Sequence, residues 1–300
     1  MPTLRALECL VAVLDAGSIT EAAARLHLSQ PALSHQIGAL ERELGTPVLE
    51  RLPRGVRPTA VGRAVLADAR AALAAAERVV RTGRAVAGGG AGTLRIACAE
   101  SMTAGLLAPV LRAWHRHRPG VLITLTETTS ADALVAALEA GEADVAVGPR
   151  PSRRSGHEEA VGREEIVLAL ATDHPLATRA SVPITDLAGL PVVHYHPDNG
   201  LGGWLDEVAA EHGTVLDAVM RTKQAATAAE LAAAGLGVAL VPTTALTRTF
   251  AGALRRLKPA PHRDVVTFIV TPSDSLVRRF RSDVRHRGIT VPAALLDKLS

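Results

Sequence analysis

Residues 88–92 read Gly-Gly-Gly-Ala-Gly, and this run divides the chain into two parts that fold separately. Glycine adopts many backbone conformations and has no side chain to pack, so such a run behaves as a flexible joint. The part before the joint shows helical patterns, whereas the part after it alternates short apolar strands with helices. A length of 300 residues fits two domains or three small ones.

Composition excludes several classes of protein. The only cysteines, Cys9 and Cys98, are far apart and form no CxxC pattern, which argues against a disulfide framework and a zinc site. No apolar run approaches the roughly 18 residues that a membrane span needs. The first residues resemble the start of a helix and not a signal peptide, so we expect a cytoplasmic protein without membrane contact.

The positive charge of the chain lies in its N-terminal part. Residues 1–88 contain eleven arginines and eight acidic residues, which accounts for the whole net charge of +3. A basic region at one end of a neutral body fits an anionic partner, although many proteins carry a charge of this size.

The same region predicts two short helices joined by a turn. Ser18 begins a capping box with Glu21, and Ser29 caps a second helix whose first turn holds Gln30 and Pro31. The second helix carries one apolar stripe, formed by Leu33, Ile37, Leu40 and Leu44.

The opposite face of this second helix is polar near its N-terminus. Gln30, Ser34, His35 and Gln36 could contact base edges and phosphates in a major groove. The alternative is an amphipathic helical hairpin with a solvated polar face. The following turn-rich segment favours DNA binding, because three arginines suit the backbone and the minor groove: Arg51, Arg54 and Arg57.

These residues resemble the N-terminal signature of LysR-type transcriptional regulators, which are bacterial proteins. The resemblance runs in register over nearly 60 residues: SITEAAARL at 18–26, SQPALS at 29–34, Gln36-Ile37, Leu40-Glu41, ELG at 43–45, LER at 49–51, Thr59 and Gly62. Leu49 departs from the Phe of many members, and His35 from a common Arg. The resemblance implies a winged helix-turn-helix domain over residues 1–58 with a DNA-contacting set of Ser29, Gln30, Pro31, Ser34, His35, Gln36, Arg51, Arg54 and Arg57.

Residues 59–92 form a linker in this scheme, with one long helix and then the joint. Apolar residues recur at three- and four-residue steps, which predicts a dimerisation seam of Leu66, Ala69, Leu73, Ala76 and Val80. The alternative is a helix that packs on its own domain. A homodimer, or a homotetramer, predicts a roughly palindromic DNA site with two half-sites.

Residues 93–300 have the pattern of an α/β fold with a largely parallel sheet. The family resemblance implies a two-lobed effector-binding domain like the type 2 periplasmic-binding proteins. Lobe one would hold residues 93–162 and 265–300, and lobe two residues 163–264. The predicted strands are 93–98, 121–127, 143–147, 166–171, 191–194, 218–221, 238–241 and 265–271, and the predicted helices are 103–117, 130–140, 202–212, 224–235 and 275–287.

Open α/β sheets bind ligands beyond the carboxyl ends of their strands, often at helix N-termini. Hydroxyl groups, a lysine and backbone amides at these positions favour a small organic anion as effector. The alternative for each hydroxyl is a helix cap. This rule selects Ser101, Met102, Thr103, Thr128, Thr129, Gly148, Tyr195, His196, Thr222 and Lys223 as effector-binding residues.

Other signals are weaker. His194 and His196 share a strand face, but no nearby residue completes a metal site. No GxSxG motif, Walker loop or catalytic carboxylate pair occurs, so we expect neither an enzyme nor a cofactor. We therefore predict a transcriptional regulator that binds double-stranded DNA and a small-molecule effector, with RNA polymerase as a further candidate partner. The alternatives are a cytoplasmic solute-binding receptor and an enzyme on the same two-lobe fold.

Overall fold

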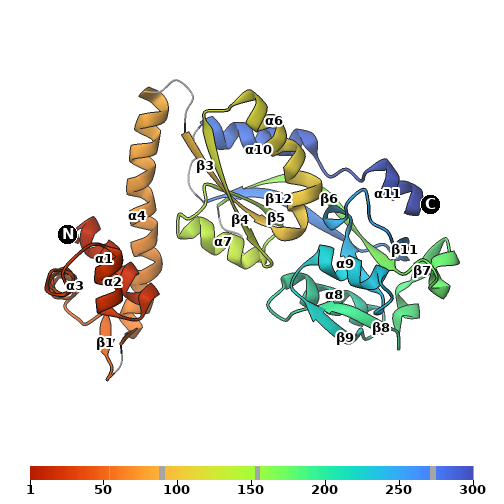
Figure 1. The fold of residues 1–300 in the computed structure, drawn as a ribbon, viewed down its shortest axis with the longest axis horizontal. Helices are drawn as coiled ribbons and strands as arrows, with labels where there is room; N and C mark the ends of the chain where they lie inside the picture. Colours follow the sequence, from red (N-terminus) through yellow and green to blue (C-terminus); the bar gives the residue numbers. More distant parts are fainter. Residues whose placement is uncertain (54, 88–91, 153–155, 271–274, 300) are drawn as a thin grey trace. The chain divides into compact units, whose positions relative to one another are not determined.

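The computed structural model describes residues 1–53, 55–87, 92–152, 156–270 and 275–299. It contains two compact units, one formed by Met1–Gly92 and a larger one that holds nearly all of the remaining chain. Figure 1 shows the elements of both units along the chain. No helix among the described residues is both long and apolar enough to cross a membrane.

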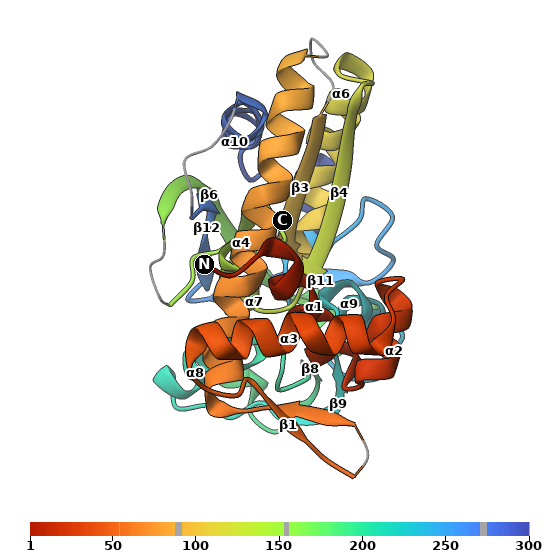
Figure 2. The same ribbon diagram turned by 90° about the vertical axis from the view of Figure 1, so that its left-hand side faces the viewer.

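The N-terminal unit contains three short helices, a two-stranded wing and one long helix (Figure 2). As predicted, Ser18 Oγ accepts a hydrogen bond from Glu21 N at 3.3 Å, and Ser29 Oγ accepts one from Ala32 N at 3.3 Å. The Glu21 side chain pairs with Arg25. The elements are α1 (Leu4–Ala16), α2 (Ile19–Arg25), α3 (Gln30–Leu44), β1 (Leu49–Arg51), β2 (Val56–Pro58) and α4 (Ala60–Ala87).

The core of this unit lies where α1, α2 and α3 meet. Leu33, Ile37 and Leu40 of α3 are buried there, whereas Leu44, the fourth member of the predicted stripe, is 39% exposed at the end of the helix. Burying one such side chain stabilises a fold by about 1.5–3 kcal/mol. Ala69 of α4 is 3% exposed and belongs to the same core. This member of the predicted dimerisation seam therefore packs within its own unit.

Lobe one is a sheet covered on both faces. Its helices α6 (Ala108–His117) and α10 (Ser275–Arg287) lie on one face, and α7 (Ala131–Glu139) lies on the other (Figure 1). The face under α6 and α10 buries Ile96 and Cys98, and the face under α7 buries Ala97, as alternation along a strand requires. Its strands are β3 (Gly92–Ala99), β4 (Val121–Thr128), β5 (Val145–Pro149) and parts of β6 (His157–Leu170) and β12 (His262–Ile269), and α5 (Glu100–Met102) and the π-helix η1 (Thr103–Leu107) lead into α6.

Lobe two is built on the far ends of the same long strands. Its core lies under α8 (Gly200–Glu211) and α9 (Ala225–Ala233). Three short 3₁₀ helices, η2 (Pro175–Thr178), η3 (Ile184–Leu187) and η4 (Thr243–Ala245), connect its strands. These strands are β7 (Ser181–Pro183), β8 (Pro191–Tyr195), β9 (Asp217–Thr222), β10 (Ala239–Pro242) and β11 (Ala253–Lys258).

The sheet is not largely parallel, and this expectation was wrong. The order is β4-β3-β5-β12-β6-β11-β7, with β10 also on β6. Strand β12 runs antiparallel to both β5 and β6, and β10 and β11 run antiparallel to β6. The reason is that β6 carries the chain from lobe one to lobe two and β12 brings it back, so the two run in opposite directions.

The C-terminal end also differs from the expected lobe division. Helix α11 (Ala293–Leu299) follows α10, but its Leu295 and Leu299 are buried in the core of lobe two. The chain therefore crosses between the lobes a third time, near Ile289, which contacts Gly162 of β6.

Candidate functional site

The polar face of α3 is presented to solvent. Ser29, Gln30, Pro31 and His35 are exposed, and Ser34 and Gln36 are half-buried, whereas Leu33 and Ile37 point into the core. The capped N-terminus of this helix places its first amides beside these side chains. Such a face can contact both base edges and phosphate oxygens.

The wing carries two exposed arginines among its described residues, and one of them is paired with a carboxylate. Glu50 lies opposite Arg57 in the β1–β2 pairing, and the Arg57 guanidinium donates two hydrogen bonds to its carboxylate, at 2.8 and 3.0 Å. This bidentate contact holds the pKa of Glu50 below its usual value. Arg51 is exposed. Arg54 lies outside the described residues.

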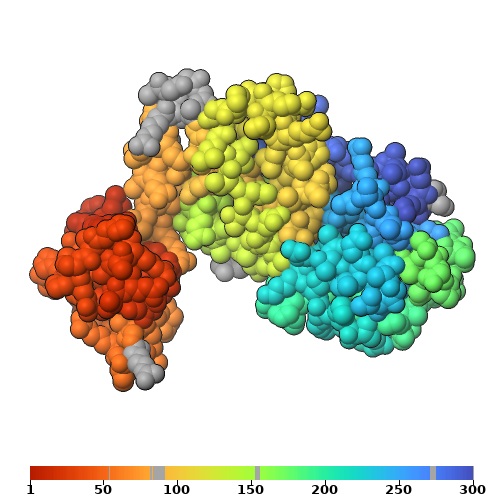
Figure 3. Space-filling model, viewed as in Figure 1, coloured from red at the N-terminus to blue at the C-terminus, as the bar shows by residue number. Residues whose placement is uncertain are grey.

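A cavity of about 550 Å³ lies between the two lobes, whose surfaces Figure 3 shows side by side in yellow to green and in cyan. Its size is within the range of small-molecule sites. Ser130, Asp132 and Arg150 line it from lobe one, and Leu201 and Trp204 from lobe two. His262, Arg263 and Asp264 of β12 also line this cavity.

Direct hydrogen bonds bridge the lobes next to this cavity. Thr129 O accepts a bond from Gly200 N at 3.0 Å, and Thr129 Oγ1 donates to Asp198 O at 3.4 Å. Glu100 Oε1 accepts a bond from Ala225 N at 2.8 Å. A second cavity of only about 20 Å³ lies between Glu100, Thr129 and Arg263, and such a volume holds about one water molecule.

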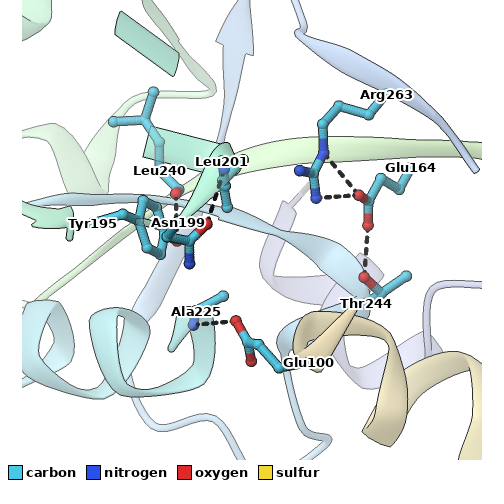
Figure 4. A network of polar contacts seen from close by, with 9 residues as sticks. All are labelled: Glu100, Glu164, Tyr195, Asn199, Leu201, Ala225, Leu240, Thr244 and Arg263. Carbon is cyan, nitrogen blue, oxygen red and sulfur yellow. Dashed lines mark hydrogen bonds and ion pairs between the residues drawn. The ribbon is translucent and has the colours of Figure 1, made fainter. Parts of the chain in front are cut away.

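A buried ion pair joins the two crossing strands (Figure 4). Glu164 of β6 is fully buried, and its carboxylate lies 2.5 Å from the Arg263 guanidinium of β12. Thr244 Oγ1 donates to the other carboxylate oxygen at 2.6 Å. The Arg263 guanidinium also lies 5.8 Å from the centre of the Trp204 ring. A paired arginine thus lies at the wall of the cavity.

Two family models match this chain over the units just described. The model described as bacterial regulatory helix-turn-helix protein, lysR family, matches residues 4–63, and the LysR substrate binding domain matches residues 87–287. The chain belongs to the LysR family. It carries both the helix-turn-helix domain and the substrate binding domain of that family, which confirms the resemblance seen in the sequence.

Individual relatives agree with this assignment. A probable hydrogen peroxide-inducible genes activator of Mycobacterium avium is 31% identical over 270 residues, covering 88% of this chain and 86% of that protein. The small neutral protease regulatory protein of Streptomyces coelicolor is 38% identical over 194 residues. That match covers 62% of this chain, and the chain spans only 57% of the relative's length. Both are named as regulators and neither as an enzyme.

A solved structure of the family shows the same fold. Full-length CbnR in complex with its target DNA is 28% identical to this chain. The two superpose with a TM-score of 0.70 over 95% of this chain and 100% of that one.

The structure of this LysR protein brings some predicted effector residues to the cleft. Ser101, Thr128 and Thr129 line the small cavity, and Thr129 also lines the large one. Thr128 Oγ1 donates to Ser130 O at 3.0 Å, a bond to a carbonyl before α7 and not the amide contact of a helix cap.

The other predicted effector residues of lobe one lie elsewhere. Met102 is fully buried in the core, and a side chain at Gly148 would meet Leu134 Cδ1 at 2.4 Å. Thr103 Oγ1 bonds to Glu127 Oε1 at 2.5 Å.

Within the part of the chain that the structure describes, none of the effector residues predicted in lobe two lines either of the two cavities. Tyr195 is buried, and its hydroxyl donates to Leu240 O at 2.9 Å. His196 Nδ1 and Lys223 Nζ lie 3.1 and 3.7 Å from Asp198 Oδ2. Thr222 Oγ1 accepts a bond from Gln224 N at 3.3 Å.

Glu100 and Arg263, which line the small cavity, are not in the predicted set of effector residues. Arg263 belongs to His262-Arg263-Asp264, a charged triplet that begins β12 directly before its buried residues, and this position was a usable signal. Glu100 directly precedes a predicted residue, but nothing local in the sequence points to its partner. His194 Nε2 lies 3.0 Å from Asp206 Oδ1, and no group of three metal-ligating side chains occurs among the residues that the structure describes.

Proposed function

We propose that this LysR regulator binds a small organic anion in the cavity between its lobes, and that occupancy changes its contacts at a promoter. The observation that carries the proposal is the large cavity itself. The N-terminal residues of α7 and α8 line it together with the arginines Arg150 and Arg263. Helix N-termini and guanidinium groups both favour anions.

The acidic residues at this cavity limit the size of the anion's charge. Asp264 accepts from Arg150 at 3.0 Å, Asp132 accepts from Ser152 at 3.3 Å, and Glu164 neutralises Arg263. A small carboxylate with one charge and a flat body beside Trp204 suits this lining better than a polyanion does.

The proposed response to the effector is a change in lobe closure. A ligand that contacts both Ser130 in lobe one and Leu201 in lobe two favours the closed lobes over open ones, and it shifts the equilibrium by its difference in affinity for the two states. The DNA contacts would come from the polar face of α3 and from the wing. The apolar residues of α4 other than Ala69 would form the contact in a homodimer or tetramer. We place this DNA-binding protein in the cytoplasm.

We do not propose cysteine-based peroxide sensing, although the Mycobacterium avium relative is named as a probable activator of hydrogen peroxide-inducible genes. Cys98 is the only cysteine after residue 9, and it is fully buried. Burial raises the pKa of its thiol to about 11. The thiolate is the reactive form, so this thiol is a poor nucleophile at neutral pH.

The experiment that tests the effector site uses the two tryptophans of the chain. In a Trp114→Phe variant, Trp204 fluorescence reports on the cavity between the lobes while a panel of small carboxylates and their neutral amides is titrated. We expect a carboxylate to bind, its amide to fail, and Arg150→Ala to weaken binding about tenfold. Arg116→Ala, which removes an exposed charge from α6, is the matched control. Equal binding of amide and carboxylate, or equal loss in both variants, would contradict an anion site at this position.

A further inference from the structure

A second groove lies on lobe one, outside the cavity between the lobes. It has a volume of about 460 Å³ and runs between α6 and α10, which lie side by side in Figure 1. Its apolar floor includes Val110 and Trp114, which are 6% and 1% exposed. This volume also falls within the range of small-molecule sites.

The rim of this outer groove is basic. Arg118, Arg279 and Arg287 line it with His117 and His286, and the single acidic residue is Asp283. Asp283 is already engaged, because Trp114 Nε1 donates to its Oδ2 at 2.9 Å and Arg279 Nε lies 3.2 Å from its Oδ1. The carboxylate inside the groove is thus neutralised by groups of the protein itself.

Two of the rim arginines keep their charge available. Among the described residues, no carboxylate lies within 4.0 Å of the guanidinium of Arg118 or Arg287. The Arg118 guanidinium lies 4.5 Å from the centre of the Trp114 ring, a cation–π contact.

Basic residues near helix C-termini also stabilise their own helices. Here α6 and α10 each contribute basic residues to the rim of one apolar groove, and helix stabilisation alone does not require that these residues face the same groove.

We propose that the outer groove is a second ligand site, which takes an amphipathic organic anion. The acidic group would bind a rim arginine, Arg118 at one end of the groove or Arg287 at the other, and the apolar body would lie over Val110 and Ala113. Charge complementarity with the rim and the apolar floor together favour this class over a bare inorganic anion and over a neutral apolar compound.

Trp114 supplies a reporter for this site. A Trp204→Phe variant leaves Trp114 as the sole tryptophan of the chain. The probe is 8-anilinonaphthalene-1-sulfonate, which combines a negative charge with an apolar body, and inorganic phosphate is the anion without that body. We expect the naphthalene probe to change Trp114 fluorescence saturably, and phosphate at equal concentration to leave it unchanged.

Charge variants decide whether the probe occupies the groove. The double variant Arg118→Ala/Arg287→Ala should bind the probe about tenfold more weakly, which corresponds to about 1.4 kcal/mol. Arg112→Ala/Arg116→Ala removes the same charge from exposed positions of α6 outside the groove and should change affinity less than twofold. Should the first double variant fail to fold, as judged by its thermal melt, the single variants Arg118→Ala and Arg287→Ala test the two ends of the groove separately, and one of them should weaken binding of the probe.

Three results would overturn the proposal. Equal weakening in both double variants would mean diffuse electrostatic attraction, and no weakening would mean that the probe binds elsewhere. Dissociation of the oligomer by Arg118→Ala/Arg287→Ala in sedimentation velocity would mean that a second copy of the chain covers the groove. None of these results bears on the cavity between the lobes, because that site is tested through Trp204.

Discussion

Glu100 Oε1 in lobe one accepts a 2.8 Å hydrogen bond from the backbone N of Ala225, the first residue of α9 in lobe two. The contact joins residues of two lobes that are far apart in the sequence. It places a carboxylate at a helix N-terminus, where the helix dipole favours negative charge. Burial nevertheless raises the pKa of Glu100, and the bond to Ala225 opposes that rise.

The first prediction concerns this contact between the lobes. Glu100→Ala removes the acceptor and should lower the free energy of unfolding by about 1.5–3 kcal/mol, the range for a hydrogen bond to a charged group. Glu100→Gln retains an acceptor oxygen and should cost less. Urea unfolding measures both, and hydrogen exchange at the Ala225 amide should quicken only in the alanine variant. Unchanged exchange there would show that the bond does not hold the lobes together.

The raised pKa of Glu100 also fixes the direction of a pH effect. Because the folded protein binds this proton more tightly than the unfolded chain does, stability falls as the pH rises from the usual glutamate value through the raised one. Glu100→Gln removes the titrating group, so its unfolding free energy should vary less over that range.

The second prediction concerns the buried pair of Glu164 and Arg263. Arg263→Ala leaves a fully buried carboxylate without its ionic partner and should lower the free energy of unfolding by about 3–5 kcal/mol. The control is Arg256→Ala on the neighbouring strand β11, because Arg256 is exposed and lies 3.6 Å from Glu165. Exposed pairs contribute only about 0–1 kcal/mol. Similar losses in the two variants would mean that the buried pair is not special.

Features that depend on residues close together in the sequence could be predicted. The caps at Ser18 and Ser29 and the buried part of the α3 stripe follow from spacings of three and four residues, so local pattern was sufficient for these helices but not for Ala69, which packs in the core of its own unit. The strands that lead to the cleft could also be predicted from the sequence. The residues expected at their carboxyl ends, Ser101, Thr128 and Thr129, line the small cavity.

The remainder depends on contacts that no local pattern encodes. Glu100 meets Ala225, and Glu164 meets Arg263. Met102 follows a strand and Tyr195 ends one, but a position along the chain does not determine the direction of a side chain. Both side chains point into a hydrophobic core. Helix α11 packs on lobe two because Leu295 and Leu299 complete its core, although the preceding helix belongs to lobe one.

The third prediction concerns two glycines of α4, for which substitution by alanine should change the stability in opposite directions. A Cβ at Gly62 would lie 2.1 Å from Val48 O, whereas a Cβ at Gly83 would meet no atom within 4 Å. Gly62→Ala should therefore destabilise the protein by about 1–3 kcal/mol through overpacking. Gly83→Ala should stabilise the helix by about 0.5–1 kcal/mol, because alanine loses less backbone entropy. Thermal melts give both signs, and a stabilising Gly62→Ala would mean that α4 does not pack closely on Val48.

The fourth prediction concerns the reactivity of Cys98. With a pKa of about 11, roughly one thiol in a thousand is ionised at pH 8. A Cys9→Ala variant should therefore react with iodoacetamide far more slowly when folded than in urea, as followed by mass spectrometry. Because the folded pKa exceeds that of the unfolded chain, stability from this group is lost as the pH rises from about 8.5 toward the folded value. Rapid folded-state alkylation at pH 7 would reopen a thiol-based role.

The last prediction separates base recognition from backbone contact in the proposed DNA interface. Ser34→Ala removes a hydroxyl from the polar face of α3 and should weaken binding to the upstream DNA of the gene about tenfold, with little effect on shuffled DNA. Arg51→Ala removes an exposed wing charge and should weaken both DNAs alike and lower the slope against salt. Fluorescence anisotropy across a salt series measures both. Equal losses on both DNAs for Ser34→Ala would count against base recognition by α3.

Glu50 provides a control with the opposite sign in the same assay. Its carboxylate holds the Arg57 guanidinium by two hydrogen bonds, so Arg57 is partly neutralised in the free protein. Glu50→Gln removes that negative charge and should tighten binding to both DNAs while steepening the dependence on salt. Arg57→Ala should weaken both DNAs less than Arg51→Ala does, because Arg57 must first leave Glu50. A larger loss for Arg57→Ala would mean that DNA displaces Glu50 completely and that Arg57 is the stronger phosphate contact of the wing.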